Sequence, residues 1–361
     1  MLTQVTNYKC PACTGPLHYA GDSGKLECEY CGSHYSVAKI EALYGEKLED
    51  AVAASPTAAK QAQQENTWGE EAAHLKSYSC PACGAELICD ENTAATSCPY
   101  CGNPTVIPGM FQGGLKPDYV LPFKLDKAAA KAALKQYYKG KKLLPKAFAE
   151  ENHIEEIKGV YVPFWLFSGR AEADISYMAT RVHVYESGDE RITDTEHYRL
   201  LREGSLSFDK IPVDASSKMP DEHMDAIEPF DYSALTAFST AYLPGYLADK
   251  YDVEEGESRE RAQARAANTV LEKVNQTVLG YTTAVADQRN VQVHMEEASY
   301  VLLPVWMLST RWKDKNYLFA MNGQTGKLIG DLPISAKRFW GWFLKISVPL
   351  TLILSFIGSF L

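Results

Sequence analysis

The stretch CPACGAELICDENTAATSCPYCG, residues 80–102, contains two Cys-x-x-Cys pairs separated by a short polar segment. The stretch CPACTGPLHYAGDSGKLECEYCG, residues 10–32, has the same arrangement at an offset of 70 residues. In both copies fourteen residues separate the pairs, and a glycine, Gly32 or Gly102, follows the last cysteine. A glycine there suits the backbone freedom that a tight turn needs. The chain therefore contains a duplicated module.

Four thiolates in two Cys-x-x-Cys turns match the tetrahedral sulfur coordination that zinc prefers, and a hairpin between the pairs makes a zinc ribbon. A module of this size has too little core to fold without a metal. We therefore expect two structural Zn²⁺ ions, each with four cysteine ligands. The predicted ligands are Cys10, Cys13, Cys28 and Cys31 in the first ribbon and Cys80, Cys83, Cys98 and Cys101 in the second.

Disulfides and free thiols are the alternative for these cysteines. The N-terminal sequence MLTQVTNYKC shows no secretory signal, which favours reduced thiols in a cytosolic setting. A catalytic zinc keeps an open coordination position, and four thiolates leave none. The ninth cysteine, Cys89, corresponds to Tyr19 in the first copy, so we expect it to be a core residue.

The composition changes along the chain and predicts an α+β protein with five segments. A linker separates two N-terminal zinc ribbons, and a duplicated α+β domain with antiparallel sheet and one C-terminal transmembrane helix follow. The segments are zinc ribbon 1 at 1–40, a spacer rich in Ala, Glu and Gln at 41–76, zinc ribbon 2 at 77–110, the α+β domain at 115–335 and the membrane segment at 339–361. The spacer is either semi-rigid and solvated or packed on the ribbons through Trp68 and Leu75.

Within the α+β domain, the periodicity of apolar residues predicts helices and strands. The predicted elements are a helix at 126–142 with Asp126 as its cap, a half-buried strand at 171–177, a helix at 254–279, strands at 289–310 and 315–330, and a hairpin turn at 322–326. The strings PFWLFSGR (163–170) and PVWMLSTR (304–311) match in register and indicate two related halves. Their tryptophans, Trp165 and Trp306, are expected in the core.

The last 23 residues, FWGWFLKISVPLTLILSFIGSFL (339–361), carry a single charge at Lys345. As a helix they would be about 34 Å long, which is enough to cross the hydrocarbon core of a bilayer. Trp340 and Trp342 fit an aromatic belt, and Lys337 and Arg338 favour a cytoplasmic start. We expect a single-pass protein of the cell membrane with its bulk in the cytoplasm. A buried core helix and a helix lying in the membrane interface are the alternatives.

The formal net charge of −10 disfavours nucleic acid as a partner. Lysines and acidic residues balance in residues 1–40, and the first arginine of the chain is Arg170. A nucleic-acid-associated zinc-ribbon protein in replication or transcription is nevertheless the alternative to a protein-binding adaptor. One dense basic cluster, Lys139, Lys141, Lys142 and Lys146, either faces anionic lipid or is an exposed helix end.

The sequence contains none of the common hydrolase, metalloprotease or nucleotide-binding motifs. His183 and His197 have acidic neighbours on a predicted hairpin, where solvated strand faces explain them. We therefore expect no enzyme activity, no catalytic or cofactor-binding residues and no small-molecule substrate.

Several strings together resemble the bacterial membrane-anchored proteins with TFIIB-type double zinc ribbons. They are ELICDENTAATSCPYCGNPT, GVYVPFWLF, SSKMPD, AYLPGYLADKYDV, FAMNGQTGKLIGDLP and the apolar tail, and the resemblance covers nearly the whole chain. It implies an adaptor that binds a phage-shock-protein-A-like membrane-stress protein at the membrane. Other members of that family carry labels that link them to primosomal helicases, but this chain has no helicase nucleotide motif.

Overall fold

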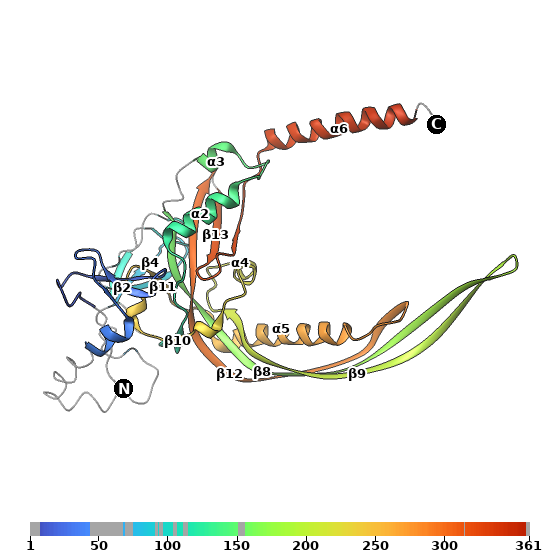
Figure 1. The fold of residues 1–361 in the computed structure, drawn as a ribbon, viewed down its shortest axis with the longest axis horizontal. Coiled ribbons are helices and arrows are strands. Elements are labelled where there is room, and N and C mark those ends of the chain that lie inside the picture. Colours follow the sequence, from blue (N-terminus) through green and yellow to red (C-terminus); the bar gives the residue numbers. More distant parts are fainter. Residues whose placement is uncertain are drawn as a thin grey trace. The chain divides into compact units, whose positions relative to one another are not determined.

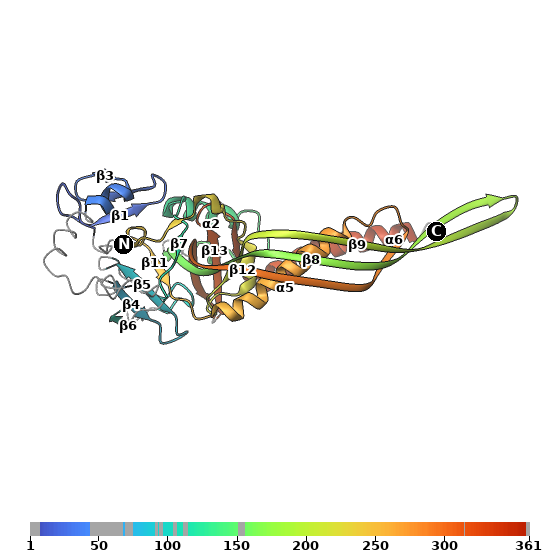
Figure 2. The same cartoon turned by 90° about the horizontal axis from the view of Figure 1, so that it is seen from below.

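The computed structural model describes residues 8–43, 68, 75–90, 93, 97–103, 107–110, 115–150, 156–313 and 315–358 (Figures 1 and 2). The chain forms two compact units. Unit 1 consists of Met1–Val162, Ser216–Lys250 and Leu302–Leu361, and unit 2 of Pro163–Ala215 and Tyr251–Val301. Helices and antiparallel strands occur in both units, so the predicted α+β class is confirmed. The predicted five-segment division stays a prediction.

In unit 1, the first cysteine module forms its own three-stranded antiparallel sheet of β1 (Leu17–Ala20), β2 (Lys25–Cys28) and β3 (His34–Tyr35). The register pairs Leu17 with Cys28 and Leu26 with Tyr35. Residues 37–43 are helical and place Ile40 in the small core of the module. The core of the module is therefore small, as we expected from the length of the module.

The second cysteine module of unit 1 belongs to a larger sheet. Its strands are β4 (Leu75–Ser79), β5 (Glu86–Asp90) and β6 (Ile107–Met110), which Figure 2 shows side by side. β11 (Leu247–Asp249) pairs with β5 in antiparallel fashion and with the first residues of β8 in parallel fashion. The same motif is therefore a separate sheet in one copy and part of a shared sheet in the other.

The rest of unit 1 surrounds the C-terminal strands. Its elements are β7 (Tyr119–Val120), α2 (Lys127–Tyr138), α3 (Lys146–Glu150), α4 (Asp221–Ala226), η3 (Tyr232–Ala234), β10 (Thr236–Ala237), η4 (Thr240–Tyr242), β13 (Lys315–Asn322), β14 (Leu328–Gly330) and α6 (Ala336–Gly358). Asp126 accepts a hydrogen bond from the Ala129 amide at 2.7 Å, which confirms the predicted cap of α2. β13 and β14 are antiparallel, and Gly326 between them has a φ of +75°, so the predicted hairpin is also confirmed.

Unit 2 consists of long strands and one helix. It contains most of β8 (Lys158–Ser187), β9 (Glu190–Asp214), part of β12 (Thr283–Trp312), and α5 (Glu255–Asn275). α5 buries one residue in every four, from Ser258 to Val274, against the alternating residues Ala173 and Ile175 of β8. This periodicity confirms the predicted strand at 171–177 and the helix in 254–279.

The two tryptophans of the repeated strings make the same contact, each within its own unit. Trp165 donates its indole N–H to the Val253 carbonyl at 3.1 Å, and Trp306 donates to the Leu125 carbonyl at 2.9 Å. Each acceptor lies two residues before the first residue of a helix, α5 or α2. Both side chains are 5% exposed, so their predicted place in the core is confirmed. The two strings therefore make matching contacts, and the division into two related halves stays a prediction.

Most of the predicted spacer, residues 44–67 and 69–74, lies outside the described residues. Trp68 is buried, and its ring lies edge-on to Phe238 at a centroid distance of 5.5 Å. This contact is with a residue outside both cysteine modules. Trp68 is therefore packed, and Leu75 is buried in β4, which pairs with β5 of the second module, so the packed alternative for the spacer describes these two residues.

The C-terminal helix α6 begins at Ala336 and contains Pro349. Within the described part of the chain, no helix has both the length and the apolarity that crossing a membrane requires. The span predicted for residues 339–361 is not confirmed, and residues 359–361 lie outside the described part.

Candidate metal centres

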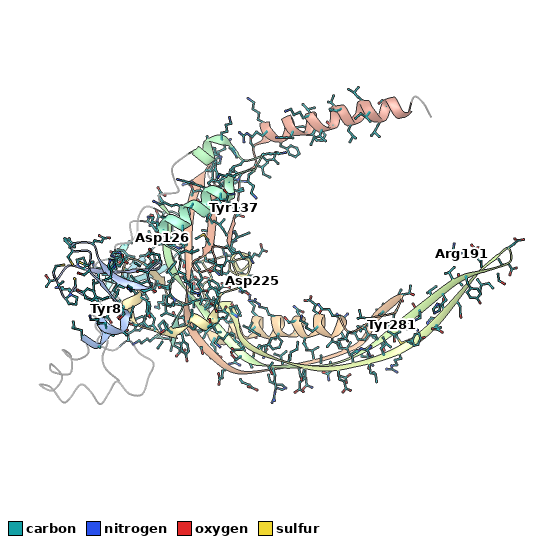
Figure 3. All side chains as sticks on the ribbon, in the orientation of Figure 1. Tyr8, Asp126, Tyr137, Arg191, Asp225 and Tyr281 are labelled. Carbon is teal, nitrogen blue, oxygen red and sulfur yellow. The ribbon has the colours of Figure 1, made fainter. Side chains whose placement is uncertain are left out.

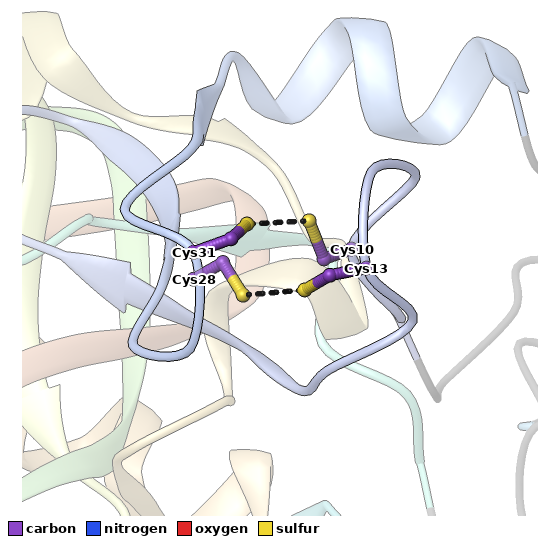
Figure 4. A group of neighbouring side chains, drawn as sticks. All are labelled: Cys10, Cys13, Cys28 and Cys31. Carbon is purple, nitrogen blue, oxygen red and sulfur yellow. Dashed lines mark hydrogen bonds between the residues drawn. The ribbon is translucent and has the colours of Figure 1, made fainter.

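The structure brings the eight predicted ligands together as two groups of four. In the first module Cys10 Sγ lies 3.5 Å from Cys31 Sγ, and Cys13 Sγ lies 3.5 Å from Cys28 Sγ (Figure 4). In the second module the corresponding pairs are Cys80 with Cys101 and Cys83 with Cys98, both at 3.6 Å. All four sulfurs of each group lie within 4.8 Å of one another.

These distances fit a metal ion and not a disulfide. A tetrahedral zinc with Zn–S bonds of about 2.3 Å separates its sulfurs by about 3.8 Å, whereas a disulfide bond is about 2.05 Å long. None of the nine cysteines, all of which lie in the described part of the chain, forms a disulfide. Each group can therefore hold one metal ion, and four sulfur donors are the set that structural zinc prefers.

The backbone of all four Cys-x-x-Cys turns has the same geometry. The residue four positions after the first cysteine donates its amide to the carbonyl of that cysteine, at 2.8 to 3.0 Å. These bonds are Thr14 to Cys10, Gly32 to Cys28, Gly84 to Cys80 and Gly102 to Cys98. The donors have φ values of 60°, 69°, 72° and 70° in that order. Positive φ favours glycine, which confirms the predicted role of Gly32 and Gly102 and leaves Thr14 as the exception.

The second turn of each module differs sharply in exposure. In the first module Cys31 is exposed, and Tyr30 beside it is 78% exposed. In the second module the equivalent tyrosine, Tyr100, is 5% exposed, and Cys101, the equivalent of Cys31, is half-buried. The first module therefore presents its second turn to solvent, while the second module packs the same surface into unit 1.

Tyr100 is held by a buried carboxylate. Its hydroxyl donates to Asp249 Oδ2 at 2.5 Å, and the Ser216 hydroxyl donates to the same oxygen at 2.7 Å. Burial raises the pKa of Tyr100 well above its ordinary value, and the negative charge of Asp249 raises it further. The phenol thus stays protonated as a donor. Neither Asp249 nor Ser216 was a predicted site residue, because both lie far from the cysteines in sequence.

Lys158 lies beside the second module. Its ammonium donates to the Ser97 carbonyl at 2.5 Å and to the Ser97 hydroxyl at 2.6 Å. Burial lowers the pKa of Lys158, and the nearby Cys98 thiolate opposes that shift. Burial likewise raises the pKa of the Cys98 thiol. A cation next to four sulfurs offsets the negative charge that four thiolates leave around a divalent ion.

The first module is anchored by its strand and not by its second turn. Tyr19 of β1 is buried, with its ring edge-on to Tyr242 at 5.1 Å, and its amide donates to the Pro244 carbonyl at 3.1 Å. At the exposed turn, a hydrogen bond with Ser33 at 3.3 Å lowers the pKa of the Cys31 thiol to about 6. This thiol ionises readily, as a metal ligand must.

The other residues considered from the sequence form no such cluster. Cys89 is buried and donates to the Thr93 carbonyl at 3.2 Å, which confirms it as a core residue. His183 on β8 pairs with Asp194, and His197 on β9 pairs with Thr180. The His183 side chain lies 3.9 Å from the Glu196 carboxylate, and both of these side chains are about half exposed. In the part of the chain that the structure describes, the groups placed closely enough to hold a metal are the two cysteine groups.

Comparison with known proteins gives one extensive match. A protein of Bacillus subtilis (strain 168), "Uncharacterized protein YdjG", is 36% identical over 343 residues, which are 95% of this chain and 94% of the relative. No family model and no solved structure matches the chain.

Proposed function

The chain belongs to the family of the Bacillus subtilis protein YdjG, and we propose that it is a non-enzymatic adaptor held at a membrane. In this proposal each cysteine group binds one structural Zn²⁺ and forms a zinc ribbon. The first ribbon binds a protein partner, and the C-terminal segment attaches the chain to the cytoplasmic face of the cell membrane.

The observation that carries the proposal is the exposed second turn of the first ribbon. A tyrosine that is 78% exposed beside a metal-stabilised turn is a large, rigid contact group at little entropic cost. Four sulfurs complete the coordination of zinc, so the metal supports this turn and leaves no position for a substrate. A structural role in binding is therefore favoured over catalysis.

The second ribbon shows how such a turn can dock. Tyr100 enters a buried site and donates to the Asp249 carboxylate, while β5 of the same module pairs with β11. Because Tyr30 occupies the same position in the repeat, we expect its partner to offer a carboxylate acceptor in an apolar surrounding. The resemblance to double-zinc-ribbon membrane proteins makes a phage-shock-protein-A-like protein the partner to test first.

Membrane attachment is supported by the side chains of α6. Its apolar residues are 36–66% exposed from Phe339 to Leu354, on all sides of the helix. A helix that is apolar all round is stable when it is covered by protein or by lipid. The cationic residues at its start favour lipid, because anionic head groups attract lysine and arginine.

The partner interaction is tested with purified full-length chain and a purified phage-shock-protein-A-like protein. Tyr30→Ala should weaken binding at least tenfold, because a central tyrosine contact contributes about 2 kcal/mol or more. The matched control is Lys25→Ala, an exposed side chain of the same ribbon, which should bind normally. Equal loss in both variants would contradict the assignment of Tyr30. Retention of the wild-type chain on a DNA column at moderate salt would favour the nucleic-acid alternative.

Membrane attachment is tested by removing residues 339–361 and fractionating cells. The shortened chain should move from the membrane fraction to the soluble fraction, while the Tyr30→Ala chain should stay with the membranes. Continued sedimentation of the shortened chain with membranes would show that the tail is not the attachment.

A further inference from the structure

A group of basic side chains lies at the start of α6 in unit 1, and we call it the cationic collar. Its members are Lys139, Lys141, Lys142, Lys146, Lys337, Arg338 and Lys345. Arg338 is half-buried, and the six lysines are exposed. The chain as a whole has a formal charge of −10, so the collar is a local exception to an acidic protein.

Contacts hold the two parts of the collar together. The Ser335 amide donates to the Leu143 carbonyl at 2.9 Å, and the Arg338 guanidinium donates to the Leu144 carbonyl. Lys142 Nζ lies 4.3 Å from the centroid of the Trp342 ring. The segment that follows α2 is thereby fixed against the first turns of α6, with Lys142 over the Trp342 ring and Lys141 over the Tyr137 ring of α2.

The collar has positive charges close together. Lys142 Nζ and Lys345 Nζ lie 4.3 Å and 5.6 Å from the same Trp342 ring, so the two ammonium groups are within about 10 Å of each other. In the described ranges, no carboxylate forms an ion pair with any member of the collar. Like charges at this separation repel, and an anion between them is favoured.

The surface directly beyond the collar is apolar. Figure 3 shows side chains projecting from both sides of the α6 ribbon, and Phe343, Leu344, Ile346 and Val348 are about half exposed. A ligand for the whole surface must therefore combine an anionic group with hydrocarbon. Trp342, an aromatic ring at the boundary, has the place that tryptophan takes between head groups and acyl chains.

We propose that the collar and Trp342 form a binding site for the phosphate groups of anionic phospholipids, with α6 in contact with their acyl chains. The site rests on the membrane attachment proposed above and adds the class of lipid. Lysines near an anionic bilayer surface each strengthen binding several-fold. Neutral zwitterionic lipid offers no net charge to the collar, so binding should depend on the anionic fraction and weaken with salt.

The test uses the purified full-length chain and flotation with vesicles, at several lipid concentrations. One set of vesicles contains phosphatidylcholine alone and the other also contains phosphatidylglycerol. The collar variant is Lys139→Gln, Lys141→Gln and Lys142→Gln combined. The control variant, with the same change in net charge, is Lys25→Gln, Lys273→Gln and Lys313→Gln, three exposed lysines outside the collar.

Wild type and control should prefer the anionic vesicles, and the collar variant should lose about a hundredfold in affinity for them. As a second readout after reconstitution, brominated phosphatidylglycerol should quench tryptophan fluorescence less in Trp342→Phe than in wild type.

Equal binding of the wild type to both kinds of vesicle, or an equal loss of affinity in the control variant, would contradict the collar as a binding site for anionic lipid. Neither result would contradict the proposed membrane attachment. Competition by inorganic phosphate at the same phosphate concentration would assign the site to free phosphate instead of lipid. Absence of binding to any vesicle would overturn both the lipid site and the membrane attachment.

Discussion

Tyr30 and Tyr100 occupy the same position in two modules with the same cysteine spacing, yet one is 78% exposed and the other 5%. The matching sulfur–sulfur distances are 3.5 Å in the first module and 3.6 Å in the second, and the turn hydrogen bonds are alike. The difference lies in the surroundings, because β11 and Asp249 cover the second module, whereas among the described residues no such cover lies on Tyr30 of the first module.

This comparison separates two roles of one motif. In the second module the metal centre and the sheet of unit 1 support each other, so the module is part of the fold. In the first module the strand β1 is anchored through Tyr19, while Tyr30 of the second turn is exposed to solvent. The same sequence pattern thus has a buried second turn in one module and an exposed second turn in the other, and the exposed turn is the surface that we propose for binding a partner.

Loss of a metal ligand should give the largest difference in stability between the two modules. Cys10→Ser and Cys80→Ser should each lower the zinc content from two ions per chain to one, measured by elemental analysis. Cys80→Ser should also lower the free energy of unfolding in urea by several kcal/mol more than Cys10→Ser, because its module shares a sheet with the rest of unit 1. Cys89→Ser is the control and should keep both ions. A larger loss of stability in Cys10→Ser would contradict the comparison.

Removing the hydroxyl of Tyr100 or of Tyr30 should give the next largest difference in the free energy of unfolding. Tyr100→Phe deletes a hydrogen bond to a buried carboxylate and should cost about 2 kcal/mol in the free energy of unfolding. Tyr30→Phe should change the stability by less than about 0.5 kcal/mol, because the side chain is exposed. Urea denaturation of both variants checks this. In the Asp249→Asn background the cost of Tyr100→Phe should shrink, and an unchanged cost would show that Asp249 is not the partner that matters.

The turn glycines give a smaller difference. Gly32→Ala and Gly102→Ala both place a side chain at positive φ, which costs about 1 kcal/mol. Gly102→Ala should cost more, because its Cβ would lie 3.4 Å from the Ser309 carbonyl and hydroxyl oxygens, whereas Gly32 faces open space. Thermal unfolding of the zinc-loaded chains measures the order. A reversed order would mean that the two turns are not packed as described.

A substitution at Thr14 should give the smallest change in stability, and it should stabilise the chain instead of destabilising it. It is the only one of the four equivalent turn residues in the described chain that is not glycine, at a φ of 60°. Thr14→Gly should raise the stability by about 0.5 kcal/mol through relief of backbone strain, less the loss of its hydroxyl bond to the Cys13 carbonyl. Thr14→Ala, which keeps the strain and loses the bond, is the control and should not stabilise.

Local elements followed from the sequence because their causes are local. The Cys-x-x-Cys turns, the Asp126 cap and the hairpin after Asn322 each depend on residues within a few positions. The burial of Trp165 and Trp306 was predictable from their apolar strings. The pairing of β5 with β11 could not be predicted, because the two strands are about 160 residues apart in the sequence. The residue pattern of one strand does not identify the other as its partner.

The sequence by itself determined which eight thiols come together and why a glycine follows the last cysteine of each module, since tetrahedral metal coordination and short-range sterics decide both. Only the tertiary structure decided that Tyr100 contacts Asp249 while Tyr30 is exposed to solvent, and that Lys142 lies over the Trp342 ring. The burial of a residue depends on which segments, distant in the sequence, pack against it in the folded chain. Two identical motifs can therefore end in opposite environments.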